Sequence, residues 1–450
     1  MERGGFALRR IFAGFVVTGL LLMVSMSAAN VVVMAGKHGN SERSLAIADA
    51  EWTFMGYLAG DNNLEFDAVS DLAEMETVAS VNGVNMLILM DTYSLIVGTH
   101  WYYLEPGVSH IEVAEDGTYI SHCDCEAIAG GCPDEDVNMG SGEVLTQFLE
   151  TAMTYAPAQK YMLDLWDHGG GWYGLCTDDT NLDRLTIDET AAAIGAANIV
   201  VDDELVPVHL DIIAYDACFM STIETAYENR FIADYMVASI TTVPGWGWGY
   251  DIFLEKMQAL EPMDTVSVCE AAVDAFVETY DLCLGAGIGG WPYPSCSMIN
   301  LMAIDELVEG VEGSPGGVTQ LAEKLHELVN IDSYRGAIES AEARTPQIQF
   351  EGEIFPFADL GWLVSLLGEK IPDMLPIARG TLELLGVAVP YWDSVTTDTD
   401  ACINTFGLSI YFTCSYEKFR DAYGDESTGL DMCAETEWDE FLEDFVKVYQ

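Results

Sequence analysis

Two residues that could do chemistry, a histidine and a cysteine, each stand just beyond the end of an apolar run. His168 lies in the run DHGGGW, which follows residues 161–166, and Cys218 closes the run DAC, which follows residues 210–215. Both preceding runs are short, mostly apolar and stopped by polar or glycine residues, as is typical of buried strands. In one parallel sheet their carboxyl ends share an edge, where open α/β folds build their sites. A cysteine beside a sequence-distant histidine indicates a thiol nucleophile activated by an imidazole base.

Each motif also has a plainer structural reading. The glycines after His168 allow backbone amides to approach a substrate and stabilise an oxyanion, or they form only a strand-end turn with a capped histidine. Cys218 is predicted at a strand-to-helix turn, where a helix N-terminus and an imidazole lower the pKa of a thiol. The alternative is a buried structural cysteine. Asp216 could line a pocket for a basic side chain, or it could cap the following helix.

An acidic loop follows the predicted histidine strand. Its oxygen-bearing side chains resemble a set of metal ligands and belong to Asp178, Asp179, Asn181 and Asp183. They do not form an EF-hand, because the required glycine and distal glutamate are misplaced. The sequence leaves two readings open, a calcium site at Asp178, Asp179 and Asp183 or a solvated acidic loop.

The segments around these motifs alternate between strand and helix patterns. A strand at 52–58, a helical stretch beginning near residue 64 and a strand at 84–90 predict a parallel βαβ unit. Helices are expected at 188–197 and 220–229, on either side of the cysteine strand. These patterns favour an α/β fold.

The second part of the chain is predicted to be mostly helical. We assign residues 51–255 to a catalytic core and residues 256–450 to a C-terminal region that completes the fold. Residues 406–412 are expected to form a late strand, which could join the main sheet. The C-terminal end carries apolar residues at helical spacing between acids, which predicts an amphipathic surface helix.

The N-terminus is predicted to direct export. Three arginines precede an apolar run at 11–26, and the small residues Ser27, Ala28 and Ala29 follow. This order is typical of a secretory signal, although the apolar character continues past it, so an uncleaved membrane anchor is the alternative. We assign residues 1–29 to a signal peptide or anchor and 30–50 to a linker. The protein is then secreted or extracytoplasmic, with a membrane tether as the second option.

The charge balance excludes some partners. The chain has 450 residues, with 17 Lys and Arg against 74 Asp and Glu, for a formal net charge of -57. So few basic residues exclude binding to nucleic acid or to anionic lipid. Such an acidic protein could function in salt, bind divalent cations or favour basic substrates. Alternatively, the acidity serves solubility alone.

The chain has 11 cysteines, an odd number. In an exported protein cysteines tend to pair, so a free Cys218 would leave ten that could form up to five disulfides. Cys123, Cys125 and Cys132 lie in one loop, where a zinc site with His122 competes with disulfides. No second C-x-x-C element completes a standard zinc site, so disulfides are favoured.

Together these residues resemble the clostripain family of C11-type cysteine peptidases, in the caspase-like clan. The resemblance spans about residues 50–450 and is most specific in the paired HG and DAC segments. The matching runs are WTFMGYLAGDNNLE (52–65), LAEMETVASVNGVNMLILMD (72–91), LWDHGGGW (165–172), DIIAYDACFMSTIETAY (211–227), GLSIYF (407–412) and WDEFL (438–442).

The resemblance implies a caspase-like αβα sandwich with a mostly parallel central sheet. It implies that His168 is the general base and acid, that Cys218 is the nucleophile, and that the amides of Gly169 and Cys218 form the oxyanion hole. It places Asp216 in the S1 pocket, where it favours Arg or Lys. It further implies protein or peptide substrates and no required cofactor, with calcium stimulation known in the family.

The chain departs from the family in the loop that should complete this pocket. Residues 239–250 carry no acid, and they offer Ser239 and Trp246 as pocket residues instead. From the resemblance we expect a secreted or surface-tethered cysteine endopeptidase that prefers Arg or Lys at P1, although the acid-free loop counts against this preference. The alternatives are a peptidase with a non-basic P1 preference and a catalytically silent caspase-like surface binding protein.

Overall fold

An eight-stranded sheet forms the centre of the molecule, in the order β16-β13-β12-β11-β6-β1-β2-β3. The computed structural model describes residues 50–80, 83–114, 116–133, 136–201, 203–286, 294–350, 353–395, 405–413, 422–424 and 429–447. The strands are β1 (Ala50–Gly60), β2 (Val84–Thr92), β3 (His100–Tyr103), β6 (Ala158–Trp166), β11 (Leu210–Asp216), β12 (Ala233–Ala238), β13 (Ser295–Asn300) and β16 (Tyr391–Ser394). The five strands from β2 to β12 in this order pair in parallel, and β3, β13 and β16 pair antiparallel at the two ends.

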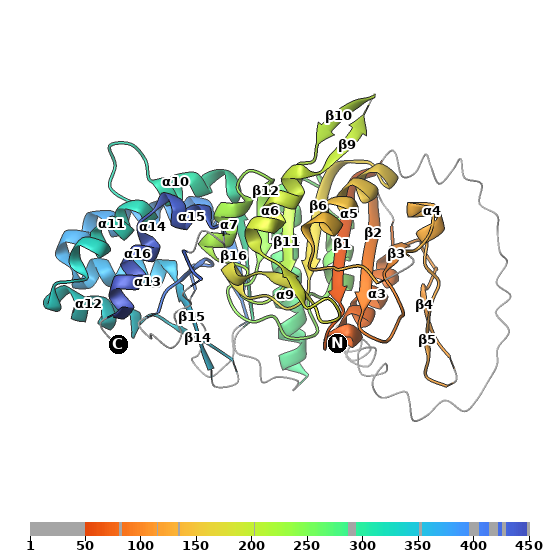
Figure 1. The fold of residues 1–450 in the computed structure, drawn as a ribbon, viewed down its shortest axis with the longest axis horizontal. Helices are drawn as coiled ribbons and strands as arrows, with labels where there is room; N and C mark the ends of the chain where they lie inside the picture. The colour runs from red at the N-terminus through yellow and green to blue at the C-terminus, as the bar shows by residue number, and fades with distance from the viewer. Residues whose placement is uncertain are drawn as a thin grey trace.

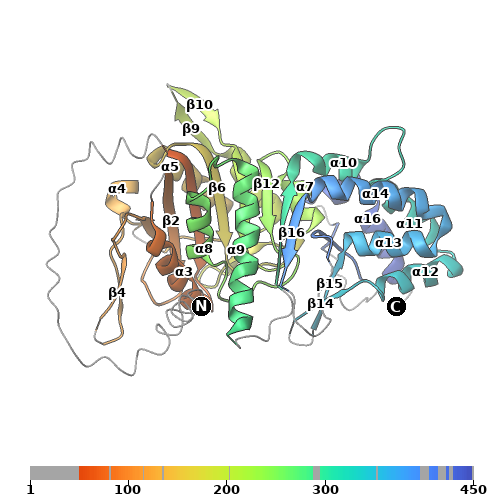
Figure 2. The same ribbon diagram turned by 180° about the vertical axis from the view of Figure 1, so that it is seen from behind.

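Helices cover both faces of the sheet (Figures 1 and 2). One face carries α5 (Gly142–Tyr155), α6 (Ile187–Ala196) and α7 (Ile223–Asn229), and the other carries α3 (Glu65–Val78), α8 (Tyr250–Gln258) and α9 (Thr265–Gly285). Alternate residues of β1 enter the two cores, Met55 and Tyr57 on one face and Phe54 and Leu58 on the other. Burial on both faces explains why the strands read as continuous apolar runs. The predicted α/β fold with a mostly parallel sheet is confirmed.

The C-terminal residues form a helical group beyond β16, at the end of the sheet opposite β3 (Figures 1 and 2). Its helices are α10 (Ile304–Glu309), α11 (Val318–Leu328), α12 (Asp332–Glu342), α13 (Leu360–Lys370), α14 (Leu375–Ala388), α15 (Asp431–Glu435) and α16 (Trp438–Lys447). The predicted amphipathic helix is α16, which buries Trp438, Phe441, Leu442 and Phe445.

One strand prediction is wrong in its pairing. The late strand β17 (Ser409–Tyr411) joins a separate three-stranded sheet with β14 (Gln347–Phe350) and β15 (Glu353–Asp359), not the main sheet. β17 cannot pair with β12 in the main sheet, because β13 already occupies that edge of β12. Only an isolated bridge between Thr222 and Ser409 links β17 to the segment after the cysteine strand.

Short hairpins surround the main sheet. They are β4 (Ile111–Val113) with β5 (Tyr119–Ser121), β7 (Leu175–Asp178) with β8 (Asp183–Leu185), and β9 (Asn198–Val201) with β10 (Glu204–Pro207). The short helix α4 (Cys125–Ala129) follows β5. Three 3-10 turns complete the described elements, η2 (Gly171–Tyr173), η3 (Leu301–Ala303) and η4 (Pro372–Met374).

Within the described part of the chain, none of the helices has the length and apolar character needed to cross a membrane. The predicted signal or anchor at 1–29 lies outside the described residues, as do nearly all of the linker and the cysteines at 402 and 414.

Candidate active site

Adjacent parallel strands place the histidine and the cysteine at the same edge of the sheet. Trp166, the last residue of β6, pairs with Asp216, the last residue of β11. The Asp167 amide donates to the Asp216 carbonyl at 3.3 Å. His168 and Cys218 therefore each stand two residues beyond a paired position. The expected juxtaposition of the two strand ends is confirmed.

Gly169 packs directly on the backbone of the cysteine. An ideal Cβ at this position would lie 2.4 Å from the carbonyl oxygen of Cys218 and 2.9 Å from its amide nitrogen. Such distances leave no room for a side chain. Glycine is required here because the two strand ends meet main chain to main chain.

The imidazole of His168 is held by a residue that the sequence patterns did not single out. The Oδ1 atom of Asn63 lies 2.9 Å from Nε2 of His168. Because an amide oxygen can only accept, Nε2 carries the proton and Nδ1 is left as the basic nitrogen. Burial lowers the pKa of His168, and the Asp179 carboxylate opposes this effect. Asn63 lies in the turn before α3, which the sequence reveals only as a turn signal.

The residues beside this pair form a buried polar support. The Nδ2 atom of Asn62 donates to Oδ1 of Asp167 at 2.7 Å, and Oδ2 of Asp167 accepts from both the amide and the hydroxyl of Thr177. Burial raises the pKa of Asp167 to about 7. This network joins the ends of β1 and β6 to hairpin β7–β8, and it fixes the backbone on both sides of His168.

The thiol of Cys218 lies against the backbone of Val243. The Val243 amide donates to Sγ at 3.3 Å, and Sγ lies 3.5 Å from the Val243 carbonyl oxygen. Burial raises the pKa of Cys218 to about 11, while hydrogen bonds from the Val243 and Gly169 amides lower it. The predicted lowering of this pKa by a helix N-terminus is wrong, because α7 begins only at Ile223 and desolvation of the half-buried thiol raises the pKa.

The chain turns sharply directly after the nucleophile candidate. Phe219 has a φ of 63°, which is unusual for a bulky residue. Its amide donates to the Thr241 carbonyl at 2.9 Å, and its ring lies 4.4 Å from that of Phe355 and 5.6 Å from that of Phe357, centroid to centroid. Packing from β15 therefore maintains a strained turn at the site, as functional sites often require.

The three predicted substrate-binding residues lie in different surroundings. Asp216 is buried, and its Oδ2 accepts from the Trp248 amide at 2.8 Å and from the Tyr250 hydroxyl at 2.9 Å. It is not the helix cap, because Thr222 caps α7. Ser239 is buried and bonded within its own turn to Thr241. The side chain of Trp246 is 41% exposed.

Acids that sequence patterns missed lie behind the loop at 243–250. An ideal Cβ on Gly247 would lie 2.4 Å from Oδ2 of Asp216 and 2.8 Å from Oδ2 of Asp71, and one on Gly245 would lie 3.6 Å from Oδ2 of Asp67. Burial raises the pKa of Asp67 to about 6 and, together with neighbouring acids, holds that of Asp71 well above its ordinary value. Both come from α3, where their spacing of four residues places them on one helix face.

The predicted calcium residues do not converge. Asp178 is buried and accepts from the Met139 amide at 3.0 Å and the Asn181 amide at 2.7 Å, whereas Asp183 is exposed and accepts from Asn138 at 2.7 Å. Among the described residues, three carboxylates that come within 4.8 Å of one another belong to Asp61, Asp91 and Asp136.

The cysteine loop contains the predicted disulfide. Cys125 and Cys132 are bonded, and His122, the predicted zinc ligand, instead lies 3.3 Å from the Glu112 carboxylate. The other described cysteines, 123, 176, 218, 269, 283, 296 and 433, are free thiols. Among the described residues, the bond between Cys125 and Cys132 is therefore the one disulfide, against an expected maximum of five in the whole chain.

Comparisons with known proteins agree with this architecture. The family model described as the clostripain family, peptidase C11, matches residues 56–351. Clostripain from Hathewaya histolytica is 30% identical over 232 residues, which cover 46% of this chain and 42% of clostripain.

Two solved structures share the fold. An inactive zymogen C11 protease from Parabacteroides distasonis gives a TM-score of 0.57 at 20% identity, over 90% of this chain and 99% of that one. A secreted C11 cysteine protease from Bacteroides thetaiotaomicron, in complex with an irreversible peptide inhibitor, gives 0.57 at 22% identity, over 86% and 99%. Because the family model matches more than half of it, the chain belongs to the clostripain family of C11 cysteine peptidases.

Proposed function

We propose that the protein is a cysteine endopeptidase that cleaves proteins or peptides outside the cytoplasm with a dyad of His168 and Cys218. The observation that carries this proposal is the meeting of the two strand ends. The Gly169 amide reaches the thiol of Cys218, while Asn63 holds the neighbouring imidazole by Nε2. A nucleophile, a base and a residue that orients the base are the parts that covalent catalysis needs.

The chemistry follows from the protonation states of the two groups. In the free protein the thiol is neutral, because its pKa is about 11, and the imidazole is also neutral. When a substrate carbonyl approaches, Nδ1 of His168 takes the thiol proton and the sulfur attacks the carbonyl carbon. His168 then returns this proton to the leaving amine, and water hydrolyses the thioester.

The Gly169 and Cys218 amides are the proposed oxyanion hole. Both are held by the contact between the two strand ends, so they need no rearrangement when the negative charge forms. The Val243 amide, which donates to Sγ at 3.3 Å, stabilises the thiolate during the proton transfer.

We propose Arg or Lys at P1, with Asp67 and Asp216 as the acids. The loop at 243–250 has no acid of its own. Its glycines, Gly245 and Gly247, let its backbone approach the carboxylates of Asp67, Asp71 and Asp216. Oδ1 of Asp216 is buried without a hydrogen-bond partner. A basic P1 side chain would supply a positive charge opposite these carboxyl groups. Ser239 would support the pocket from beneath, and the exposed ring of Trp246 would cover the aliphatic part of the P1 side chain.

The proposed dyad chemistry uses only groups of this chain and requires no cofactor. The calcium ion that the family resemblance implies fits Asp61, Asp91 and Asp136 better than the acidic loop. Asp61 and Asp91 are buried, and both oxygens of Asp61 and Oδ2 of Asp91 have no hydrogen-bond partner. Hard carboxylate oxygens are the ligands that calcium prefers. Held there, the ion would neutralise acids at the ends of β1 and β2, next to Asn62 and Asn63.

We further propose that residues 51–255 form the catalytic core and that residues 256–450 complete it. The main sheet gains β13 and β16 from the second region, and β15 packs behind Phe219. Export of the protein, with its N-terminal segment as signal or tether, agrees with the secreted relative from Bacteroides thetaiotaomicron.

A peptide library incubated with the purified protein, with cleavage read by mass spectrometry, tests activity and specificity together. Cleavage after Arg or Lys is the expected result. Cleavage only after other residues would overturn the P1 proposal, and no cleavage by a folded, reduced protein would favour the surface binding protein over the peptidase.

A further inference from the structure

Two sulfur atoms and one imidazole converge near β3, and a third sulfur is bonded to one of these two. The Sγ atoms of Cys123 and Cys132 are 3.0 Å apart, and Cys132 is bonded to Cys125. A ring nitrogen of His100 lies within 4.8 Å of the sulfurs of Cys123 and Cys132. The sequence offered His122 as the nitrogen ligand, but the structure supplies His100 from β3 instead.

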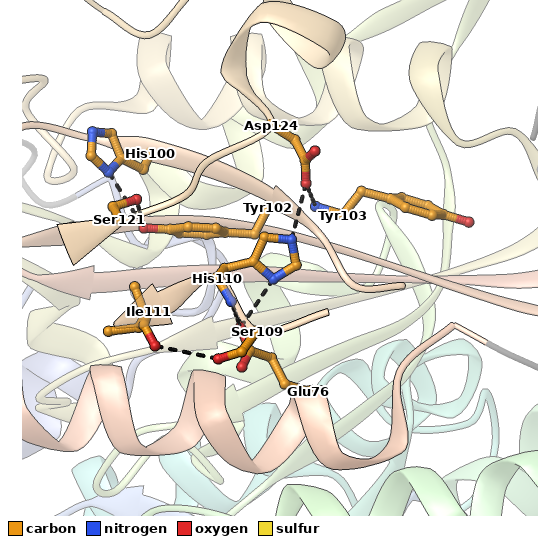
Figure 3. A network of polar contacts seen from close by, with 9 residues as sticks. All are labelled: Glu76, His100, Tyr102, Tyr103, Ser109, His110, Ile111, Ser121 and Asp124. Carbon is orange, nitrogen blue, oxygen red and sulfur yellow. Dashed lines mark hydrogen bonds and ion pairs between the residues drawn. The ribbon is translucent and has the colours of Figure 1, made fainter. Parts of the chain in front are cut away.

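The backbone that carries these groups is fixed by contacts that do not involve sulfur. Asp124, between two of the cysteines, accepts from the Tyr103 amide at 2.9 Å and lies 3.2 Å from Nε2 of His110 (Figure 3). His110 also contacts Glu76 of α3 at 3.0 Å, and the Asp124 amide donates to the Trp101 carbonyl at 2.8 Å. These hydrogen bonds therefore hold the backbone of the cysteine loop against β3.

We propose that Cys123, Cys125, Cys132 and His100 form a zinc site in the reduced protein. Three thiolates and one imidazole are a standard tetrahedral ligand set for structural zinc. Ligand atoms of Cys123, Cys132 and His100 already lie within 4.8 Å of one another, and reduction of the disulfide frees the neighbouring Cys125 thiol to complete the set.

Zinc binding and the disulfide exclude each other, because both use the sulfurs of Cys125 and Cys132. A dithiol reductant opens the bond between Cys125 and Cys132 by giving two electrons and two protons, and it becomes a disulfide itself. Zinc then displaces the protons of the three thiols as it binds. The oxidised protein keeps the disulfide and a free Cys123 thiol, and so it cannot bind the ion with all four ligands.

The site would act on the loop that leads toward the dyad. The segment after Cys132 continues to Asn138 and Met139, which donate to Asp183 and Asp178 of hairpin β7–β8 at 2.7 Å and 3.0 Å. The same hairpin is anchored to Asp167 beside His168 through Thr177.

Cobalt titration of the full chain, reduced with a phosphine under anaerobic conditions, tests the proposal. The expected result is one equivalent of Co²⁺ with thiolate charge-transfer bands and the intense visible bands of tetrahedral cobalt, which zinc then displaces. Cys123→Ser and His100→Ala should each weaken binding at least tenfold. His122→Ala is the matched control and should bind as the unaltered protein does.

Two outcomes of this titration would overturn the proposal. Cobalt that binds without thiolate bands, or no binding at all, would exclude the site. Equal effects of His122→Ala and His100→Ala would exclude the assigned nitrogen ligand. Circular dichroism of each variant before reduction shows whether the chain is folded. A Cys218→Ala variant should bind cobalt normally, so the result does not depend on the proposed peptidase activity.

Discussion

Asn63 and His168 lie beyond the ends of two neighbouring strands, and Oδ1 of Asn63 is 2.9 Å from Nε2 of His168. This contact sets the tautomer of the imidazole and leaves Nδ1 free for its proposed role as the base. Asn63→Ala should lower kcat on the order of 10²-fold by misplacing the ring, with little change in KM. Asn63→Asp keeps an acceptor but adds charge, so it should retain more activity and shift the pH–rate profile upward. An unchanged profile in Asn63→Asp would mean that the contact is only structural.

Gly169 is expected to tolerate no side chain. Gly169→Ala would press its Cβ into the Cys218 carbonyl, 2.4 Å away, and displace two proposed oxyanion donors. We expect kcat to fall by about 10²–10³-fold. Gly170→Ala is the matched control, because its Cβ would meet nothing closer than 3.4 Å and its φ is -135°. Similar losses in the two variants, measured by peptide hydrolysis, would contradict the special role of Gly169.

Asp67 should decide the preference for basic residues. Asp67→Asn should lower kcat/KM for substrates with Arg or Lys at P1 by about tenfold or more, because it removes a half-buried opposite charge. Substrates with a neutral P1 side chain should be affected little. Asp116→Asn, on the exposed β4–β5 turn, is the control acid. A uniform loss over all substrates would show that Asp67 supports the fold rather than the pocket.

Asp91 is expected to make stability depend on pH and, through the proposed calcium site, on calcium. Burial and the Asp136 carboxylate raise the pKa of Asp91 from 3.8 to about 9. The folded protein therefore binds the extra proton between these values, so stability falls as pH rises through that window. Asp91→Asn should stabilise the calcium-free protein at pH 8 by about 1–3 kcal/mol. Calcium should raise the Tm of the unaltered protein but not of the variant. An equal calcium response in both would exclude Asp91 as a ligand.

Much of the scaffold could be predicted because it depends on local patterns. The apolar runs at 161–166 and 210–215 identified the two central strands, and their polar ends identified His168 and Cys218. The placement of Asp67 and Asp71 could not be predicted in this way, because it depends on how α3 packs against the loop at 243–250, and that of Asn63 depends on the pairing of β1 with β6.

Two other expectations failed for reasons of tertiary structure. The pKa of Cys218 is set by burial and not by the helix that follows it, since the turn at Phe219 delays the start of α7 to Ile223. His100 was overlooked because it reaches the cysteine loop from a strand more than twenty positions earlier, whereas His122 is adjacent in sequence but turns to Glu112.

The most direct measurement compares peptide hydrolysis by the unaltered protein, Cys218→Ala and Cys283→Ala, together with mass-spectrometric mapping of a peptide-based thiol inhibitor. Cys283 is a free, buried thiol outside the site and serves as the matched control. The account predicts that Cys218→Ala has no activity and takes no label, while Cys283→Ala retains both and is labelled at Cys218. Hydrolysis that survives in Cys218→Ala, or a label on another cysteine, would contradict the assignment of Cys218 as the nucleophile.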